Sequence, residues 1–351
     1  MPEHVEIQEY VDLAPFTTLK IGGRARFFVR ATDIDHVAAA VNFAEKRAIP
    51  IFVLGGGSNV VVSDREFAGV VLHIAISGKC VVEQREHLSP DTVILRAAAG
   101  EDWDGFVNYC VSLDLGGIEC LSGIPGLVGG TPVQNVGAYG QEVSETIVGL
   151  EVYDRKLHTV RRMTHEECGF AYRSSIFNTA ERERYIVLSV DFKLLKGHEP
   201  NLTYRDLQTY FGESLPTLSK VREAVIKIRR AKSMVIDASD RNSKSVGSFF
   251  KNPVVENAVF ERISTQYSHA PCYPVNDTHV KIPAAWLIEN AGFSKGYKRG
   301  NAGISTNHTL ALINLGGASA NDMIGLMDEI VGGVENKFAI RLTPEPVFIG
   351  F

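Results

Sequence analysis

The most constraining feature of this sequence is a stretch of 22 residues, 120–141, that contains no charged side chain. The stretch carries six glycines and two prolines, together with the amides Gln134 and Asn135. A lipid-facing helix would not contain so many helix breakers and amides, because lipid offers no hydrogen-bond partner to a freed backbone group. The stretch is also too long and too poor in charge for a solvated connector. We therefore expect a loop that is buried or that covers a ligand.

A second glycine-rich segment, GGGSN at 55–59, directly follows the apolar residues 51–54, which we expect to form a buried strand. Glycines let backbone N–H groups approach an anion closely, and Ser58 and Asn59 add side-chain donors. The segment matches neither GxGxxG nor GxxxxGK[ST], so an ordinary glycine-rich turn remains the alternative. For the loop at 120–141 the alternative is a purely structural role. Together the two segments favour dinucleotide binding.

Hydrophobic periodicity predicts a mixed architecture. Apolar residues at helical spacing predict helices at 34–44, 103–111, 218–232 (with basic residues on its other face) and after a capping box at Ser319–Asp322. Apolar or alternating runs predict strands at 51–54, 60–62, 93–98, 147–153 and 185–195, and a final strand pair at 339–342 and 347–351. The clean alternation at 185–195 predicts a strand that is buried on one face. Because helices and strands mix without strict βαβ alternation, we expect α+β domains.

Composition narrows the range of partners. The 351 residues suggest about two domains, and 41 acidic against 36 basic residues leave no broad basic face for nucleic acid or an anionic membrane. The five cysteines form no CxxC pair and the ten histidines no HExxH, so we expect neither a disulfide framework nor a metal site. The acidic N-terminus has no apolar run typical of a secretory signal, and we expect a cytoplasmic protein.

Three shorter motifs contain polar side chains that could take part in binding or catalysis. Arg173 stands among aromatic residues and could clamp a carboxylate at two points, although a surface arginine beside a strand is the alternative. Ser248 and Asn252 flank two phenylalanines and could line a half-dry pocket, unless the segment is simply a core strand. Glu345 lies between two prolines that would hold it stiffly, or that merely end the last helix.

Five motifs occur in this order: GGGSN at 55–59, IPGLVGGTPVQNVGAYG at 124–140, YRSSIF at 172–177, GSFFKNP at 247–253 and TPEPVFIG at 343–350. As a set they closely resemble the UDP-N-acetylenolpyruvoylglucosamine reductase family. The resemblance extends from the segment Thr17–Gly23 to Phe351. Leu202–Leu207 resembles the tyrosine loop of the subtype with a longer substrate domain, and Lys281–Glu289 also matches that domain.

The resemblance implies an FAD enzyme of peptidoglycan synthesis that uses NADPH to reduce UDP-N-acetylglucosamine enolpyruvate to UDP-N-acetylmuramate. It implies a two-part FAD-binding unit of the vanillyl-alcohol-oxidase type and a C-terminal α+β substrate-binding domain, in a protein that we expect to be a monomer. The segments would be 1–70 and 71–232 for the two FAD-binding subdomains, 233–338 for the substrate-binding domain and 339–351 for a C-terminal segment carrying Glu345. A flavin oxidase of the same superfamily and a non-catalytic nucleotide-binding protein remain the alternatives.

The resemblance also implies site residues, and none of them is a metal ligand. Catalytic positions would be Arg173, Ser248 and Glu345, with Ser248 giving a proton after hydride transfer from reduced FAD. FAD would be held by Gly55, Gly56, Gly57, Ser58, Asn59, Ser122, Ile124, Pro125, Gly126, Gly129, Gly130, Gln134, Asn135, Gly137, Ala138 and Tyr139. Substrate would be bound by Tyr172, Tyr204, Lys232 and Asn252.

Overall fold

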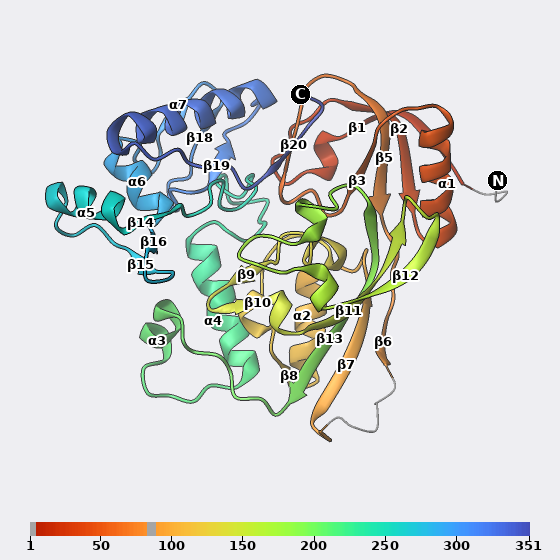
Figure 1. The fold of residues 1–351 in the computed structure, drawn as a ribbon, viewed down its shortest axis with the longest axis horizontal. Coiled ribbons are helices and arrows are strands. Elements are labelled where there is room, and N and C mark those ends of the chain that lie inside the picture. The colour runs from red at the N-terminus through yellow and green to blue at the C-terminus, as the bar shows by residue number, and fades with distance from the viewer. Residues whose placement is uncertain (1–4, 83–88) are drawn as a thin grey trace. The chain divides into compact units, whose positions relative to one another are not determined.

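The computed structural model describes residues 5–82 and 89–351 of the chain. The chain forms two compact units (Figure 1). The first unit comprises Met1–Val11, Ala25–Gly57 and Ala68–Val235. The second comprises Asp12–Arg24, Ser58–Phe67 and Ile236–Phe351, so the chain enters it twice before its main part begins. The GGGSN segment is therefore divided between the two units after Gly57.

The first sheet of the first unit has four strands in the order β1-β2-β5-β3. These strands are β1 (Gln8–Asp12), β2 (Arg24–Ala31), β5 (Phe67–Ile74) and β3 (Ile51–Leu54), and β3 runs parallel to β5. Helix α1 (Ile34–Lys46) begins after Asp33, whose side chain accepts a hydrogen bond from the backbone N–H of His36 at 2.9 Å. The predicted helix at 34–44 and the predicted strand at 51–54 are thus confirmed as α1 and β3.

A six-stranded antiparallel sheet forms the centre of the first unit. Its order is β12-β11-β13-β7-β6, with β8 also paired to β13. The strands are β6 (Lys79–Val82), β7 (Thr92–Ala98), β8 (Leu115–Gly116), β11 (Ile147–Asp154), β12 (Thr159–Thr164) and β13 (Tyr185–Lys196). Helix α2 (Trp103–Ser112) packs here through Trp103 and Phe106, whose ring centroids lie 5.8 and 5.0 Å from that of Phe192.

The prediction that strand 185–195 is buried on one face is wrong. Every residue of β13 from Ile186 to Phe192 is buried, including the polar Ser189 and Asp191 on the face that alternation assigned to solvent. Asp191 is covered by two arginines, because Arg96 Nε and Arg162 Nη2 each lie 2.7 Å from its carboxylate. Ion pairs with long side chains therefore cover the polar face of this central strand.

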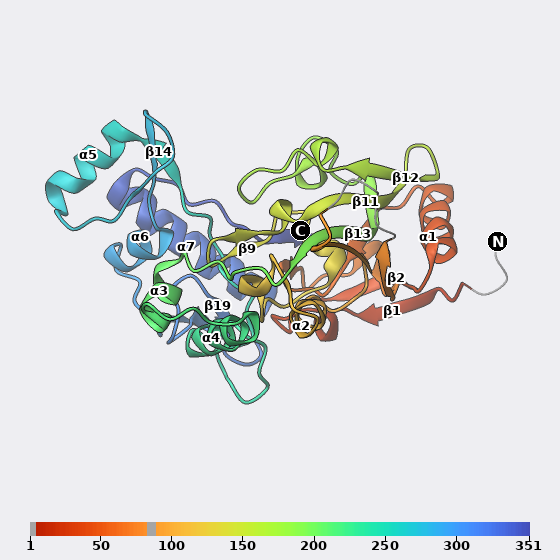
Figure 2. The same ribbon diagram turned by 90° about the horizontal axis from the view of Figure 1, so that it is seen from below.

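The rest of the first unit is largely irregular and surrounds two further helices, α3 (Arg205–Phe211) and α4 (Leu218–Ala231). These helices lie side by side in both views (Figures 1 and 2). The irregular part includes the short strands β9 (Gly137–Ala138) and β10 (Gln141–Glu142) and the 3-10 turns η2 (Glu119–Leu121), η3 (Val128–Gly130), η4 (Val143–Glu145), η5 (Glu166–Cys168) and η6 (Ile176–Asn178). The uncharged stretch 120–141 thus forms a loop, as expected.

The second unit combines helix α7 (Ala320–Phe338) with several small sheets, of which β17-β18-β19 contacts the helix. The strands are β4 (Val60–Val62), β14 (Val254–Glu256), β15 (Tyr273–Pro274), β16 (His279–Lys281), β17 (Lys298–Arg299), β18 (Ala302–Ile304), β19 (Leu312–Asn314) and β20 (Val347–Ile349). The other helices are η1 (Ala14–Phe16), α5 (Asn257–Gln266) and α6 (Ala284–Asn290). The predicted capping box is confirmed, since Ser319 and Asp322 each bond the other's backbone N–H group.

The predicted final strand pair is wrong. Residues 347–349 form β20, but its partner is β4, with which it pairs in parallel. Residues 339–342 form no strand, because Ala339 ends α7 in the left-handed conformation at φ 56°. The apolar residues 60–62 therefore do not resume the sheet that contains β3; they form a strand of the other unit.

Candidate functional site

The two glycine-rich segments meet within the first unit. A methyl group added to Gly56 would lie 2.7 Å from Cα of Gly126, and one added to Gly129 would lie 2.5 Å from Cβ of Ala99. At Gly56 the approach is of backbone to backbone, which only glycine allows. At Gly55 and Gly130, by contrast, nothing lies within 4 Å of an added methyl group. The paired loops therefore present bare backbone toward open space, which is what a phosphate or a flat polar ring requires.

Side chains of helices α2 and α4 hold the long loop in place. The backbone N–H of Gly123 donates to Asp104 at 2.6 Å, and Arg222 grips the same carboxylate through two bonds of 2.6 and 2.9 Å. Burial alone would raise the pKa of Asp104, but the bonds from Arg222 and Gly123 outweigh it and lower this pKa. Ser122 is fully buried and donates its hydroxyl to the Glu119 carbonyl at 2.6 Å. The loop's first turn is thus held rigidly.

Arg173 is bound to the far end of the same loop. Its Nη2 donates to the Gly137 carbonyl at 2.6 Å and its Nη1 to the Asn135 carbonyl at 3.4 Å. Its side chain is only 19% exposed, unlike the surface arginine of the alternative interpretation, and its guanidinium carbon lies 5.1 Å from the centre of the Tyr172 ring. The guanidinium is thereby fixed beside the loop that is predicted to hold FAD.

Asn135 organises this contact through its buried side chain. Its Nδ2 donates to Glu142 at 2.7 Å and to the Ala171 carbonyl at 3.1 Å, and its Oδ1 accepts from the Ser144 N–H at 3.2 Å. The polar atoms of this side chain are therefore bonded within the unit. Its place in the fold is to join the long loop to the turn that carries Arg173.

Three predicted site residues have left-handed backbone conformations, with φ of 46° at Asn135, 50° at Tyr139 and 52° at Arg173. This conformation costs roughly 1–2 kcal/mol for a residue with a β-carbon, and somewhat less for asparagine. Such strain persists only where the surrounding contacts impose it, and it is concentrated at functional sites.

A second group of predicted residues gathers beside α3 and α4. The rings of Tyr139 and Tyr204 lie 5.2 Å apart, and Lys232 Nζ lies 5.8 Å from the centre of the Tyr139 ring. Lys232 also forms an ion pair with Asp206 at 2.6 Å. Burial lowers the pKa of Lys232, but the bond to Asp206 and the nearby Tyr139 outweigh it and raise this pKa. The ammonium group therefore stays charged. Tyr204 is 43% exposed.

Three residues of this region, Arg222, Arg229 and Asp206, are not among the predicted site residues. The sequence places Arg222 and Arg229 opposite the apolar face of α4 or in its last turn, and the structure shows that both are bonded within the unit. Arg222 bonds Asp104, and Arg229 is inserted beside Gly123, with its Nη2 bonded to the Met234 carbonyl at 2.7 Å. Helical spacing gives the signal, because Arg229 stands four residues after the buried Val225. For Asp206 the signal is its place in the segment that resembles the tyrosine loop, two residues after Tyr204.

The second unit brings Ser248 and Glu345 onto neighbouring segments. The Glu345 N–H donates to the Phe249 carbonyl at 2.9 Å and the Lys251 N–H to the Thr343 carbonyl at 3.0 Å, so the two segments run antiparallel. Phe249 and Phe250 are core residues, whereas Ser248 is half-buried. The alternative of a core segment thus holds for the phenylalanines.

Asn59 and Asn252 support this part of the second unit. Asn59 accepts from the Val347 N–H at 3.0 Å through its carbonyl, and its Nδ2 lies 3.4 Å from the Glu345 carbonyl. Asn252 accepts from the Ala284 N–H at 2.9 Å, at the start of α6, which leaves its amide NH₂ group as the donor that a substrate could use. Ser248, Glu345 and Asn252 therefore share one unit, and Arg173 belongs to the other.

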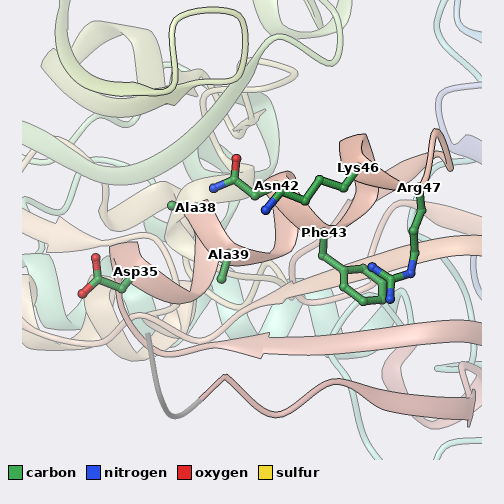
Figure 3. Close-up of a pocket in the computed structure, with 7 residues that line it drawn as sticks. All are labelled: Asp35, Ala38, Ala39, Asn42, Phe43, Lys46 and Arg47. Atoms are coloured by element: carbon green, nitrogen blue, oxygen red, sulfur yellow. The ribbon is translucent and has the colours of Figure 1, made fainter. Parts of the chain in front are cut away.

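One surface hollow lies elsewhere, over α1, and it contains none of the predicted site residues (Figure 3). Its walls include Asn42, Phe43 and Lys46, with the Arg47 guanidinium stacked 3.7 Å from the centre of the Phe43 ring. Across residues 5–82 and 89–351, no helix is long and apolar enough to cross a membrane. The same residues contain no group of three His, Cys, Asp or Glu side chains suited to a metal ion.

Comparison with known proteins identifies the family. Residues 25–162 match the FAD-binding domain family, and residues 239–349 match the C-terminal domain of UDP-N-acetylenolpyruvoylglucosamine reductase. The chain is 45% identical to the UDP-N-acetylenolpyruvoylglucosamine reductase of Thermobifida fusca, with 97% of each chain covered. It is 45% identical to that of Salinispora arenicola, covering 96% of this chain and 94% of the relative.

A solved structure shows the same fold. The reductase of Thermus caldophilus superposes with a TM-score of 0.64 over 99% of both chains, at 24% sequence identity. The predicted fold class, an FAD-binding unit with a C-terminal α+β domain, is confirmed. This chain belongs to the family of FAD-dependent UDP-N-acetylenolpyruvoylglucosamine reductases.

Proposed function

We propose that this protein reduces the enolpyruvyl ether of UDP-N-acetylglucosamine enolpyruvate to the lactyl ether of UDP-N-acetylmuramate, with NADPH as reductant. The observation that carries the proposal is that the two bare glycine loops contact each other and that the long loop binds Arg173, in a chain of this family. We place the enzyme in the cytoplasm as a monomer that supplies peptidoglycan precursor for cell-wall growth, cell shape and division.

The cofactor would be held by the bare backbone of residues 55–59 and by the long loop from Ser122 to Tyr139. When bound, FAD reduced by NADPH supplies the hydride. The open positions at Gly55 and Gly130 support this assignment, because any side chain there would fill the space in front of the backbone. We propose that the segments 1–70 and 71–232 contribute the FAD-binding parts, 233–338 the substrate-binding part and 339–351 the segment with Glu345.

We assign Arg173 to the substrate carboxylate. Hydride addition to the vinyl carbon leaves negative charge on the carbon beside that carboxylate, and a preorganised cation stabilises this charge best. Two carbonyl acceptors hold the Arg173 fork, so it need not reorganise as the charge develops. A planar guanidinium also matches both oxygens of a carboxylate, which an ammonium group does not.

We assign Ser248 as the proton donor to the resulting carbanion and Glu345 as the acid that supports it. A serine hydroxyl is a weak acid, but a carbanion beside a carboxylate is basic enough to take its proton. The backbone bond between Glu345 and Phe249 fixes the Glu345 main chain next to that of Ser248. Two flanking prolines restrict the Glu345 segment further.

We assign Tyr172, Tyr204, Lys232 and Asn252 to substrate binding, with Lys232 offsetting the negative charge of the diphosphate. The raised pKa of Lys232 supports this role, since a charged ammonium is what a diphosphate attracts. Tyr204 is exposed and its ring lies against that of Tyr139, beside Lys232, which supports its assignment to this site.

The test is turnover by the purified protein. We expect a yellow protein whose flavin is bleached by NADPH without oxygen and recovers its colour when UDP-N-acetylglucosamine enolpyruvate is added. Peroxide production in place of substrate reduction would favour a flavin oxidase. A colourless protein that cannot be reconstituted with FAD would contradict the proposal and favour a non-catalytic nucleotide-binding protein.

A further inference from the structure

Glu119 is a carboxylic acid side chain with 0% exposure in the turn that precedes the long loop. Its Oε2 accepts from the Gly117 N–H at 2.8 Å. Its Oε1 accepts from the Gln141 side-chain amide at 2.8 Å and from the Asn201 N–H at 3.2 Å. Within the described part of the chain, no lysine or arginine forms an ion pair with it. Burial of a carboxyl group costs free energy unless it is hydrogen-bonded, so the three N–H groups that donate to Glu119 must be fixed in place.

The bond to Asn201 joins Glu119 to the segment that leads into Tyr204. Asn201 is itself held from three sides: its carbonyl accepts from Cys120 Sγ at 3.3 Å, its Nδ2 donates to the Gly140 carbonyl at 3.2 Å, and its Oδ1 accepts from the Thr203 N–H at 3.0 Å. Residues 197–204 contain no helix or strand of their own. Their position relative to the long loop therefore depends on these side-chain bonds.

The residues that follow belong to the proposed substrate site. Tyr204 precedes α3 directly, and its ring lies 5.2 Å from that of Tyr139. Asp206, in the first turn of α3, binds Lys232. A displacement of Asn201 would thus move both the tyrosine hydroxyl and the partner of the lysine. Neither Glu119 nor Asn201 needs to touch the substrate for this effect.

We propose that Glu119 is a positioning residue that sets substrate affinity by fixing Asn201 and, through it, Tyr204 and Asp206. The proposal rests on the assignment of Tyr204 and Lys232 to substrate binding. It requires a carboxylate, because Glu119 accepts from three N–H groups and a glutamine amide would place NH₂ against at least one of them.

The test is Glu119→Gln in the FAD-loaded enzyme. We expect the KM for UDP-N-acetylglucosamine enolpyruvate to rise about tenfold, the equivalent of one well-placed hydrogen bond. The flavin content and the rate of flavin reduction at saturating NADPH should stay within about twofold of wild type. In a Tyr204→Phe background the same change should raise KM less, because part of the effect of Glu119 is exerted through the Tyr204 hydroxyl.

Asp154→Asn is the matched control. Asp154 is also fully buried in the first unit and also accepts backbone N–H bonds, from Lys156 and Leu157. We expect this variant to lose stability with an unchanged KM. If it raises KM as much as Glu119→Gln, or if the KM effects of Glu119→Gln and Tyr204→Phe multiply in full, the positioning role is refuted.

A second variant keeps the test decisive if Glu119→Gln does not fold. Glu119→Asp keeps the carboxylate but shortens the side chain by one methylene group, so it draws the acceptor away from the Asn201 N–H and should raise KM by a similar factor. An unchanged KM in that variant would refute the proposal. Failure of the wild-type protein to turn over the substrate would instead refute the proposed function, so the two failures are distinguishable.

Discussion

Alanine substitutions at Gly55 and Gly56 separate loop packing from cofactor contact. A methyl group on Gly56 would lie 2.7 Å from Cα, 3.1 Å from the carbonyl carbon of Gly126 and 3.3 Å from the Leu127 nitrogen, all of which are backbone atoms. No rotamer change can relieve such a clash, so the two loops must move apart. Overpacking of this kind costs about 1–3 kcal/mol. We expect Gly56→Ala to lose that much unfolding free energy and to bind FAD roughly tenfold or more weakly.

Gly55→Ala should behave differently. Nothing lies within 4 Å of the added methyl group, so the FAD-free protein should unfold within about 0.5 kcal/mol of wild type. The methyl group would, however, occupy the space in front of the backbone that is proposed to face FAD. We expect a rise of about tenfold in the FAD dissociation constant, measured by titration of the FAD-free protein with flavin fluorescence as the signal.

Gly332→Ala provides the control. Gly332 lies inside α7 with open space at its β-position, so alanine should stabilise the helix by up to about 1 kcal/mol and leave FAD affinity unchanged. An unchanged FAD dissociation constant in Gly55→Ala would refute the inference that this bare backbone contacts the cofactor. A Gly56→Ala protein as stable as wild type would refute the argument from loop packing.

Three further predictions concern the chemistry and the stability of the fold. Arg173→Lys should lower kcat far more than it raises KM, because the ammonium keeps the charge but loses the planar fork; a normal kcat with a raised KM would reduce Arg173 to ground-state binding. Ser248→Ala should leave flavin reduction by NADPH near its normal rate and slow reoxidation by the enolpyruvyl substrate about 10²–10⁴-fold in stopped-flow traces, and equal slowing of both steps would indicate misfolding instead. Burial would raise the pKa of Asp191, but Arg96 and Arg162 outweigh it and lower this pKa. The ion pairs therefore stabilise the fold above about pH 4, and this stabilisation is lost as the pH falls through the lowered pKa. The Tm difference between wild type and Asp191→Asn should therefore shrink below about pH 4, and a difference independent of pH would contradict this reasoning.

Local sequence patterns predicted most elements because those elements depend on local rules. Helix α7 begins where the capping box Ser319–Asp322 places it, and α1 follows the Asp33 cap. The patterns failed where a distant partner decides. Alternation in β13 predicted a solvated face, but Arg96 and Arg162 come from other strands and cover it. Likewise, the pairing of 347–349 depends on residues 60–62, nearly the whole chain away.

The same distinction applies to the candidate site. Recognisable sequence motifs contain the two glycine loops, Arg173 and Ser248. Glu119 lies in no such motif, and Asp206 lies in the segment that resembles the tyrosine loop without being singled out there. The importance of both depends on Asn201 and Lys232, which are distant in sequence. Arg229 stands in the last turn of α4, where a basic residue usually faces water, but its side chain is inserted beside Gly123. Arg229 stands four residues after the buried Val225, and this spacing indicates that both lie on the same face of the helix.

The division of the chain has a chemical consequence. The first unit holds the paired loops and the cation that would stabilise negative charge, and the second holds the hydroxyl and the carboxylic acid proposed for protonation. The glycine turn links the two covalently, since Gly57 ends one part of the first unit and Asn59 bonds the backbone of Val347 in the second. A cofactor phosphate on this turn would therefore act on the same short segment that supports the Glu345 backbone. Loss of FAD should on this argument loosen residues 343–349, which hydrogen exchange of the FAD-free and FAD-loaded proteins would reveal as a difference at β20.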